Sequence, residues 1–279
     1  MKLLRIGETG KEIVAALDSK NKIRDLSSHI YDLNPDTINF ENLEKLQDVN
    51  LENLPILDSK SRIGSCVSRP GDFLAVGLNY KAHADGTKSK LPSEPILFNK
   101  STGCILGPND PIIKPPEATK LDYEVEIAMI IGKKAKYVKE KNAQDYIFGY
   151  CIVNDISERS WQKERGGQWI KGKSIAGTCG PTLVSKDEIK DINNIDLTLE
   201  VNGEKRQAGN TKLMIFNFNF LISHISQFMT LYPGTIITTG TPAGTAMEMP
   251  EPKFLQDGDK ISLNVEYLGE QNHVVISEN

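Results

Sequence analysis

The segment at residues 121–127, with the sequence LDYEVEI, constrains the fold more than any other because acidic and hydrophobic residues alternate along it. This period of two is typical of a β-strand, in which alternate side chains project from one face. Asp122, Glu124 and Glu126 would then share a face at a spacing of about 6–7 Å. Carboxylates this close raise one another's pKa unless a cation lies among them. The alternation therefore indicates either a strand built around a metal ion or an ordinary strand with one solvated face.

A second strand supplies a further carboxylate. Asp155 follows the apolar residues 150–153 and precedes a helix that we predict over residues 155–163. If the two strands meet, Glu124, Glu126 and Asp155 provide three oxygen ligands, a set that favours Mg²⁺, Mn²⁺ or Ca²⁺ over zinc. Asp122 is then a neighbouring or surface residue rather than a ligand. The alternative is that Asp155 or Ser157 caps the helix.

Composition excludes several classes of protein. The 279 residues suit one large or two modest domains, and a net charge of −4 with mixed signs predicts no binding to nucleic acid or to an anionic membrane. No apolar run is long enough to cross a membrane, and the first residues turn polar too soon for a signal peptide. Four widely spaced cysteines indicate buried thiols, so we expect a cytoplasmic protein.

The texture of the chain changes near residue 65. Residues 1–65 predict a small α/β module, with strands near residues 2–6 and 11–17 and a partly helical stretch at 34–47. Residues 66–279 contain short apolar runs broken by Gly and Pro, and the clearest helix covers residues 218–231. Many short strands and few helices indicate a mixed, β-rich α+β fold that is closed or sandwiched.

Two loops after predicted strands carry reactive groups. His83 lies in GLNYKAH at residues 77–83, where it could serve as an acid or base near neutral pH or lie on the surface. The loop TTGTPAG at residues 238–244 offers hydroxyls and free amides that could bind a carboxylate, or it forms a simple turn.

A third segment, GQWIKGKS at residues 167–174, matches the phosphate-binding pattern G-x-x-x-x-G-K-[ST]. That pattern binds phosphate only between a strand and a helix. A polar, helix-like stretch precedes it and a Gly- and Pro-rich stretch follows, so we reject nucleotide binding. Lys173 could instead neutralise negative charge on an anion beside a metal ion.

In their order and spacing, five motifs across about residues 70–276 resemble the fumarylacetoacetate hydrolase superfamily. These are Gly77-Leu78-Asn79-Tyr80-x-x-His83, Pro95-Ile96-Leu97-Phe98-x-Lys100, Asp122-Tyr123-Glu124-Val125-Glu126, Gly149-Tyr150-x-x-x-Asn154-Asp155 and Gly240-Thr241-Pro242-x-Gly244. The run at residues 159–173 is similar to the branch of ureidoglycolate lyase and 2,4-diketo-3-deoxy-L-fuconate hydrolase, which is close to hydroxy-heptadienedioate isomerases. The resemblance implies a β-roll core around a divalent metal, usually Mg²⁺ and sometimes Mn²⁺ or Ca²⁺, and a homodimer.

The resemblance also implies roles for individual residues. Glu124, Glu126 and Asp155 match the metal ligands, and Lys173 matches the active-site lysine. The positions that match substrate-binding residues are Tyr80, Lys100, Arg159, Gln162 and Thr241.

One position departs from the superfamily pattern. Members that hydrolyse C–C bonds commonly carry a Glu three residues after the His, and the pair activates water on a lid helix. Here Gly86 holds that position and Asp85 lies one residue early. Either Asp85 assists His83 in catalysis, or water activation is lost.

The expected function is therefore a metal-dependent hydrolase. It would cleave a C–C bond of a small 2-oxo acid, such as an acylpyruvate or a 2,4-diketo sugar acid, through a metal-stabilised enolate. The alternative is a lyase, isomerase or decarboxylase acting on a related 2-oxo acid or on ureidoglycolate. A non-enzymatic binding protein is the third possibility.

Overall fold

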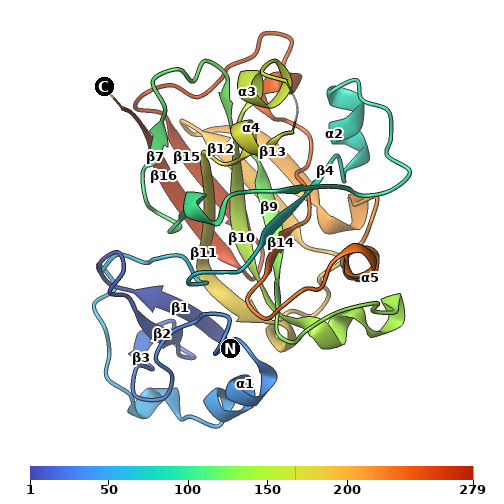
Figure 1. Ribbon diagram of the computed structural model, residues 1–279. Helices are drawn as coiled ribbons and strands as arrows, with labels where there is room; N and C mark the ends of the chain where they lie inside the picture. The colour runs from blue at the N-terminus through green and yellow to red at the C-terminus, as the bar shows by residue number, and fades with distance from the viewer. Residues whose placement is uncertain (167, 279) are drawn as a thin grey trace.

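The computed structural model describes residues 1–166 and 168–278 and forms a β-rich α+β fold built on two sheets (Figure 1). The larger sheet contains, in spatial order, β3 (Ile23–Asp25), β2 (Ile13–Leu17), β1 (Lys2–Ile6), β11 (Ala176–Ser185), β10 (Ile147–Glu158), β9 (Val125–Ile131), β14 (Ile236–Thr238), β4 (Phe73–Gly77) and β5 (Ile96–Asn99). The short strands β6 (Ile105–Leu106) and β8 (Leu121–Asp122) pair with β11 and β10.

The smaller sheet contains β13 (Glu204–Asn210), β12 (Asp196–Val201), β15 (Lys260–Val265), β16 (Gly269–Ser277) and β7 (Ile112–Lys114), in that spatial order. The α-helices are α1 (Phe40–Gln47), α2 (Lys81–Gly86), α3 (Arg159–Lys163), α4 (Ile170–Lys173) and α5 (Phe218–Phe228). Short 3₁₀ helices are η1 (Leu51–Asn53), η2 (Thr102–Cys104), η3 (Glu140–Tyr146), η4 (Lys186–Glu188), η5 (Thr211–Leu213) and η6 (Ala246–Glu248).

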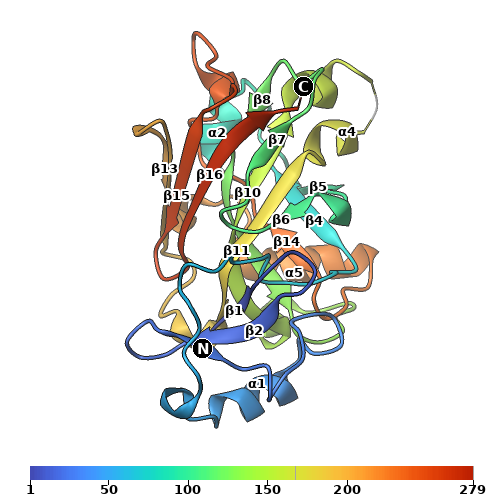
Figure 2. The same cartoon turned by 90° about the vertical axis from the view of Figure 1, so that its left-hand side faces the viewer.

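Strand β9 shows how the sequence pattern builds the core between the sheets. Val125 and Ile127 belong to one buried cluster with Leu263 of the smaller sheet, which lies against the larger one in Figure 2. Ala128 and Ile130 lie on the opposite face and belong to a second buried cluster. Both faces of β9 are therefore covered, and a polar group on this strand is largely shielded from water.

The N-terminal segment extends the larger sheet. Strand β1 pairs antiparallel with β11, with Leu3 opposite Leu183. Leu3 and Leu26 share a buried cluster with Phe73 and Val153 of the remaining chain. The strands and helix predicted within residues 1–65 are present at the end of the molecule opposite α2, α3 and α4 (Figure 1). The boundary at residue 65 stays a prediction.

Two predicted elements are wrong in their limits. The strand predicted over residues 121–127 is interrupted between β8 and β9. The helix predicted from Asp155 is also wrong, because β10 continues to Glu158 and α3 begins at Arg159 with Glu158 as its N-cap. Pairing with β8 and with β11 on the two edges of β10 satisfies the backbone here, which outweighs the local preference for a helix.

Two expectations from composition can be compared with the fold. All four cysteines are buried and free, as their spacing predicts. Among the residues that the structure describes, no helix is both long and apolar enough to span a lipid bilayer.

The shared cluster predicts that the N-terminal segment does not unfold by itself. Leu3→Ala should lower the free energy of unfolding by about 2–5 kcal/mol, because Leu3 is fully buried against the main sheet. Urea unfolding followed by circular dichroism should show one transition that shifts as a whole. Two transitions, of which only a minor one moves, would instead indicate an independent module.

Candidate active site

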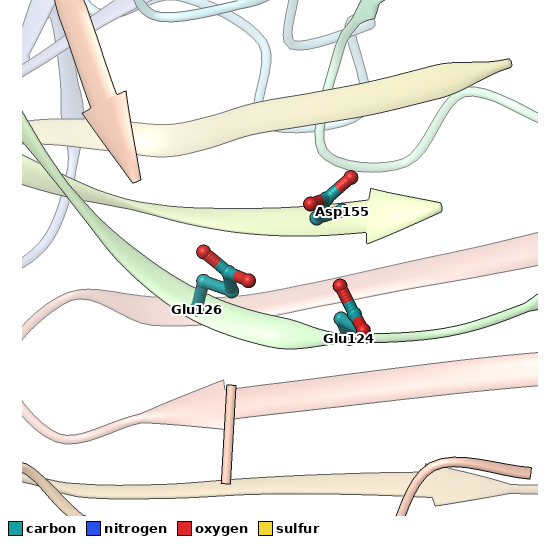
Figure 3. Close-up of side chains that lie close together, drawn as sticks. All are labelled: Glu124, Glu126 and Asp155. Atoms are coloured by element: carbon teal, nitrogen blue, oxygen red, sulfur yellow. The ribbon is translucent and has the colours of Figure 1, made fainter. Parts of the chain in front are cut away.

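Three carboxylates meet where β10 pairs with the chain around β9. Asp155 lies opposite Glu124 and donates its backbone amide to the Glu124 carbonyl at 2.9 Å, while Val153 lies opposite Glu126. The register turns Glu124, Glu126 and Asp155 to one side of the sheet (Figure 3). Each offers an oxygen within 4.8 Å of the others, and all three side chains are buried. The period of two and the second strand thus bring the predicted ligands together.

Buried cations compensate these carboxylates. Lys173 Nζ lies 2.5 Å from Glu124 Oε2 and 3.0 Å from Asp155 Oδ2. Lys100 Nζ lies 2.5 Å from Asp155 Oδ1. Arg159 binds Glu124 through Nη2 at 2.6 Å and Asp122 through Nε at 2.8 Å. Because a buried charge without a partner is costly, each cation holds its carboxylate in a fixed position.

The two glutamates differ in their preference for a proton. Burial would raise the pKa of Glu124, but the charges of Arg159 and Lys173 outweigh burial and hold that pKa well below its usual value. Burial, followed by the charges of Asp155 and Glu124, raises the pKa of Glu126 well above its usual value. The Gly240 amide donates to Glu126 Oε2 at 2.9 Å. Of these two glutamates, Glu126 is therefore the one that takes up a proton more readily.

Asp122 was expected either beside the metal ligands or on the surface. The structure excludes the surface position. Its side chain is fully buried and binds Arg159. The backbone amides of Ala246 and Met247 donate to its two oxygens at 2.8 and 3.3 Å. Asp122 therefore ties the loop around η6 to the arginine that supports Glu124.

A small pocket opens beside the carboxylates, with a cavity volume of about 70 Å³. His83 and Lys173 reach its wall, as do Glu124 and Glu126. Phe98, Trp169 and Met247 supply apolar surface, and their position is not evident from the sequence. This volume is far below the roughly 300–1,000 Å³ of sites for drug-sized ligands. The pocket thus suits a compact molecule.

Three of the predicted substrate-binding residues line this pocket. They are Arg159, Gln162 and Thr241. Gln162 accepts a hydrogen bond from Arg159 Nη1 at 3.2 Å, which orients the guanidinium. The Thr241 hydroxyl donates to the Val125 carbonyl at 2.9 Å and accepts from Gln207 Nε2 at 2.8 Å. Its hydroxyl proton is already used, so this side chain also holds the strand that carries the glutamates.

Tyr80 and Lys100 are buried behind the pocket wall rather than on it. Lys100 binds Asp155 and so supports a carboxylate instead of meeting a ligand. The Tyr80 hydroxyl has no hydrogen-bond partner among the described residues, and burial together with the charge of Glu126 raises its pKa. Neither residue lines the pocket, and their expected role in substrate binding stays a prediction.

The segment with the phosphate-binding pattern ends beside the carboxylates. Its first residue, Gly167, lies outside the described residues. Lys173 lies in α4, and its ammonium group pairs with Glu124 and Asp155.

Asp85 does not reach the pocket. It is exposed on α2, whereas His83 on the same helix is buried and lines the pocket. The carboxylate near His83 is instead that of Glu248 in η6, whose Oε1 lies 3.2 Å from His83 Nδ1. Glu248 was not among the residues predicted from the sequence. The spacing Thr245-x-x-Glu248 is that of a helix capping box, which could have indicated that this glutamate is held in place.

The support role of Lys100 leads to a stability prediction. Lys100→Met should lower the free energy of unfolding of the metal-free protein by about 3–5 kcal/mol, because it leaves Asp155 without one of its cations. Added Mg²⁺ should recover part of that loss in urea unfolding. The matched change Lys141→Met, at an exposed lysine, should have little effect. Unchanged stability in Lys100→Met would return Lys100 to a substrate-binding role.

Comparisons with known proteins agree with this architecture. Residues 72–276 match the family described as fumarylacetoacetate (FAA) hydrolase C-terminal. A relative from Burkholderia orbicola, named only provisionally as a hydrolase, is 47% identical over 274 residues, covering 97% of each chain.

Two solved structures each align over the full length of both chains. Fumarylacetoacetate hydrolase from Exiguobacterium antarcticum is 33% identical with a TM-score of 0.87. Maleylpyruvate hydrolase from Sphingobium sp. SYK-6, in complex with manganese(II) and pyruvate, is 26% identical with a TM-score of 0.83. With most of its length matched to the family and a full-length fold in common with these enzymes, the chain belongs to the fumarylacetoacetate hydrolase family.

Proposed function

We propose that this protein is a divalent-metal-dependent hydrolase that cleaves a C–C bond of a small 2-oxo acid of the acylpyruvate or 2,4-diketo acid class. The observation that carries the proposal is the convergence of three buried carboxylates with Lys173 and Arg159 at a compact pocket. The Sphingobium relative, which holds manganese and pyruvate, supports the choice of both cation and product.

The donor set fits a hard cation. Glu124, Glu126 and Asp155 offer oxygen ligands only, and such a set suits Mg²⁺ or Mn²⁺ better than zinc. Burial, followed by the charges of Asp155 and Glu124, raises the pKa of Glu126, and a bound cation would offset these effects. When bound, a divalent cation would supply a Lewis acid that polarises a substrate oxygen.

The charge of the site favours an anionic ligand. Four carboxylates, those of Asp122, Glu124, Glu126 and Asp155, are joined by three cations, which leaves one negative charge when every group is ionised. A bound dication makes the same set positive by one charge. An organic acid, and the enolate that forms when its C–C bond breaks, would both be stabilised there.

The residues around the pocket divide the remaining work. Arg159, oriented by Gln162, and Lys173 present positive charge toward a bound acid. His83 would take a proton from water and return it to the departing carbon. Trp169 and Met247 form part of the apolar wall of the pocket and would limit access of bulk water. Such positioned acid–base groups typically contribute about 10²–10⁴-fold to a rate.

Metal binding should depend on pH. Mg²⁺ should bind more tightly as pH rises toward the raised pKa of Glu126, because binding must displace the proton that Glu126 holds. Calorimetric titrations in buffers with different ionisation enthalpies should reveal this proton release. Glu126→Gln should weaken binding and abolish the release, while Glu44→Gln at an exposed site should do neither. Equal Mg²⁺ affinity in Glu126→Gln would contradict the assignment of the ligand.

The proposed hydrolysis can be assayed directly. With Mg²⁺ or Mn²⁺, the protein should convert an acylpyruvate into pyruvate and a free acid, and removal of the metal by EDTA should stop turnover. The assay should include oxaloacetate, ureidoglycolate and a hydroxy-heptadienedioate, with products identified by mass spectrometry. Carbon dioxide, urea or an isomer as the main product would replace hydrolysis by a decarboxylase, lyase or isomerase activity.

A further inference from the structure

The glycine at position 86 is explained by a neighbour far along the chain. A Cβ atom built on Gly86 would lie 2.3 Å from Glu248 Oε1 and 3.0 Å from Glu248 Cδ. The space that a side chain at position 86 would enter is therefore already filled by the carboxylate of Glu248. The same carboxylate lies 3.2 Å from His83, one turn before Gly86 on α2.

The loop around η6 holds this carboxylate firmly. Glu248 Oε2 accepts hydrogen bonds from the amides of Gly244 and Thr245, both at 2.7 Å, and from the Thr245 hydroxyl at 3.0 Å. Burial would raise the pKa of Glu248, but the hydrogen bonds and the charge of His83 lower it overall, so the group is ionised at neutral pH. Glu248 thus presents a fixed negative charge.

The other carboxylate oxygen of Glu248, Oε1, has no hydrogen-bond partner among the described residues. Glu248 Oε1 and His83 Nδ1 are both buried, and neither makes an aligned hydrogen bond with any described group. Each side chain is only 7% exposed. Two unpaired polar atoms 3.2 Å apart in such a place need only a small rotation to form a hydrogen bond.

The loop is also tied to the carboxylate cluster. Asp122 accepts hydrogen bonds from the amides of Ala246 and Met247, both in η6, and its Oδ2 also binds Arg159. Arg159 in turn binds Glu124. The position of Glu248 relative to the proposed metal ligands is therefore fixed by a continuous set of buried polar contacts.

We propose that Glu248 is the positioning residue for His83, supplying from the η6 loop the carboxylate that helix α2 lacks. It would accept the Nδ1 proton and so leave Nε2 as a base for the pocket. This inference rests on the proposed hydrolysis and identifies how its water is activated. With Glu248 in this role, Asp85 is not needed to assist His83. Water activation is then retained although position 86 is a glycine.

The step balances with water as the only co-reactant. The water oxygen forms a bond to the acyl carbon while its proton moves to His83 Nε2. The C–C bond to the pyruvate unit then breaks, and its electron pair remains on that unit as the enolate. The enolate carbon takes the proton back from Nε2, which gives a free acid, pyruvate and the original histidine.

Glu248→Gln is the decisive variant. The glutamine can keep the hydrogen bonds from Gly244 and Thr245, but its amide donates to Nδ1 and forces the proton onto Nε2. We expect kcat for acylpyruvate hydrolysis to fall by about 10²–10⁴-fold with KM changed by less than about threefold. The matched change Glu251→Gln, at an exposed position in the following loop, should leave both constants unchanged.

A spectroscopic readout tests the pair without turnover. Nitrogen NMR of the Mg²⁺-loaded parent should show His83 protonated at Nδ1 and free at Nε2, with the signals assigned by their loss in His83→Gln. Glu248→Gln should reverse this tautomer. A parent protonated at Nε2 would overturn the proposal, as would parental kcat in a folded Glu248→Gln variant. A loss of kcat in Asp85→Asn, without one in Glu248→Gln, would assign the role to Asp85.

Exchanging the residues at positions 86 and 248 gives a second test, which does not depend on whether the Glu248→Gln variant folds. Gly86→Glu alone should reduce kcat because its side chain meets Glu248. Adding Glu248→Gly should recover at least about tenfold in kcat, because one carboxylate again faces His83. No recovery in a folded double variant would count against the pairing. If the parent releases no pyruvate from any acylpyruvate, the proposed hydrolysis fails, while the tautomer still decides whether Glu248 positions His83.

Discussion

The ion pairs between buried carboxylates and buried cations are the interaction on which the site depends. Strands β9 and β10 are covered on both faces, and Glu124, Glu126 and Asp155, which lie on or beside them, are almost fully buried at the pocket. Desolvation of this kind costs several kcal/mol per charge unless a partner is present. Lys100, Lys173 and Arg159 supply partners for Asp155 and Glu124, and burial beside these two carboxylates raises the pKa of Glu126.

This balance changes how several residues are understood. Lys100 and Asp122 are fully enclosed and act on neighbouring charged groups rather than on a ligand. Thr241 uses its hydroxyl to fix the strand behind the glutamates. The pocket is then lined by groups whose positions are set by contacts behind them. Such support keeps donors and acceptors in place while charge develops during a reaction.

The sequence predicted the shared face of Glu124 and Glu126 because that pattern is local, whereas Asp155 joins them only because a second strand pairs beside them. Alternation with a period of two places Glu124 and Glu126 on one face wherever the strand pairs. It did not predict the limits of the elements around Asp155, since pairing with strands distant in sequence extended β10 through residues that locally favour a helix. Asp85 was a reasonable candidate by its proximity to His83 along the chain, but the helix turns it to solvent.

By itself, the sequence determined which kinds of chemical group the site contains: carboxylates on strands, a lysine and arginine near them, and a histidine after a glycine-bounded strand. Only the tertiary structure decided which of these groups meet. The carboxylate facing His83 comes from a capping box near the end of the chain, at a position matched to the missing side chain of Gly86. The reason is physical, because a carboxylate acts through distance and burial, and neither depends on separation along the chain.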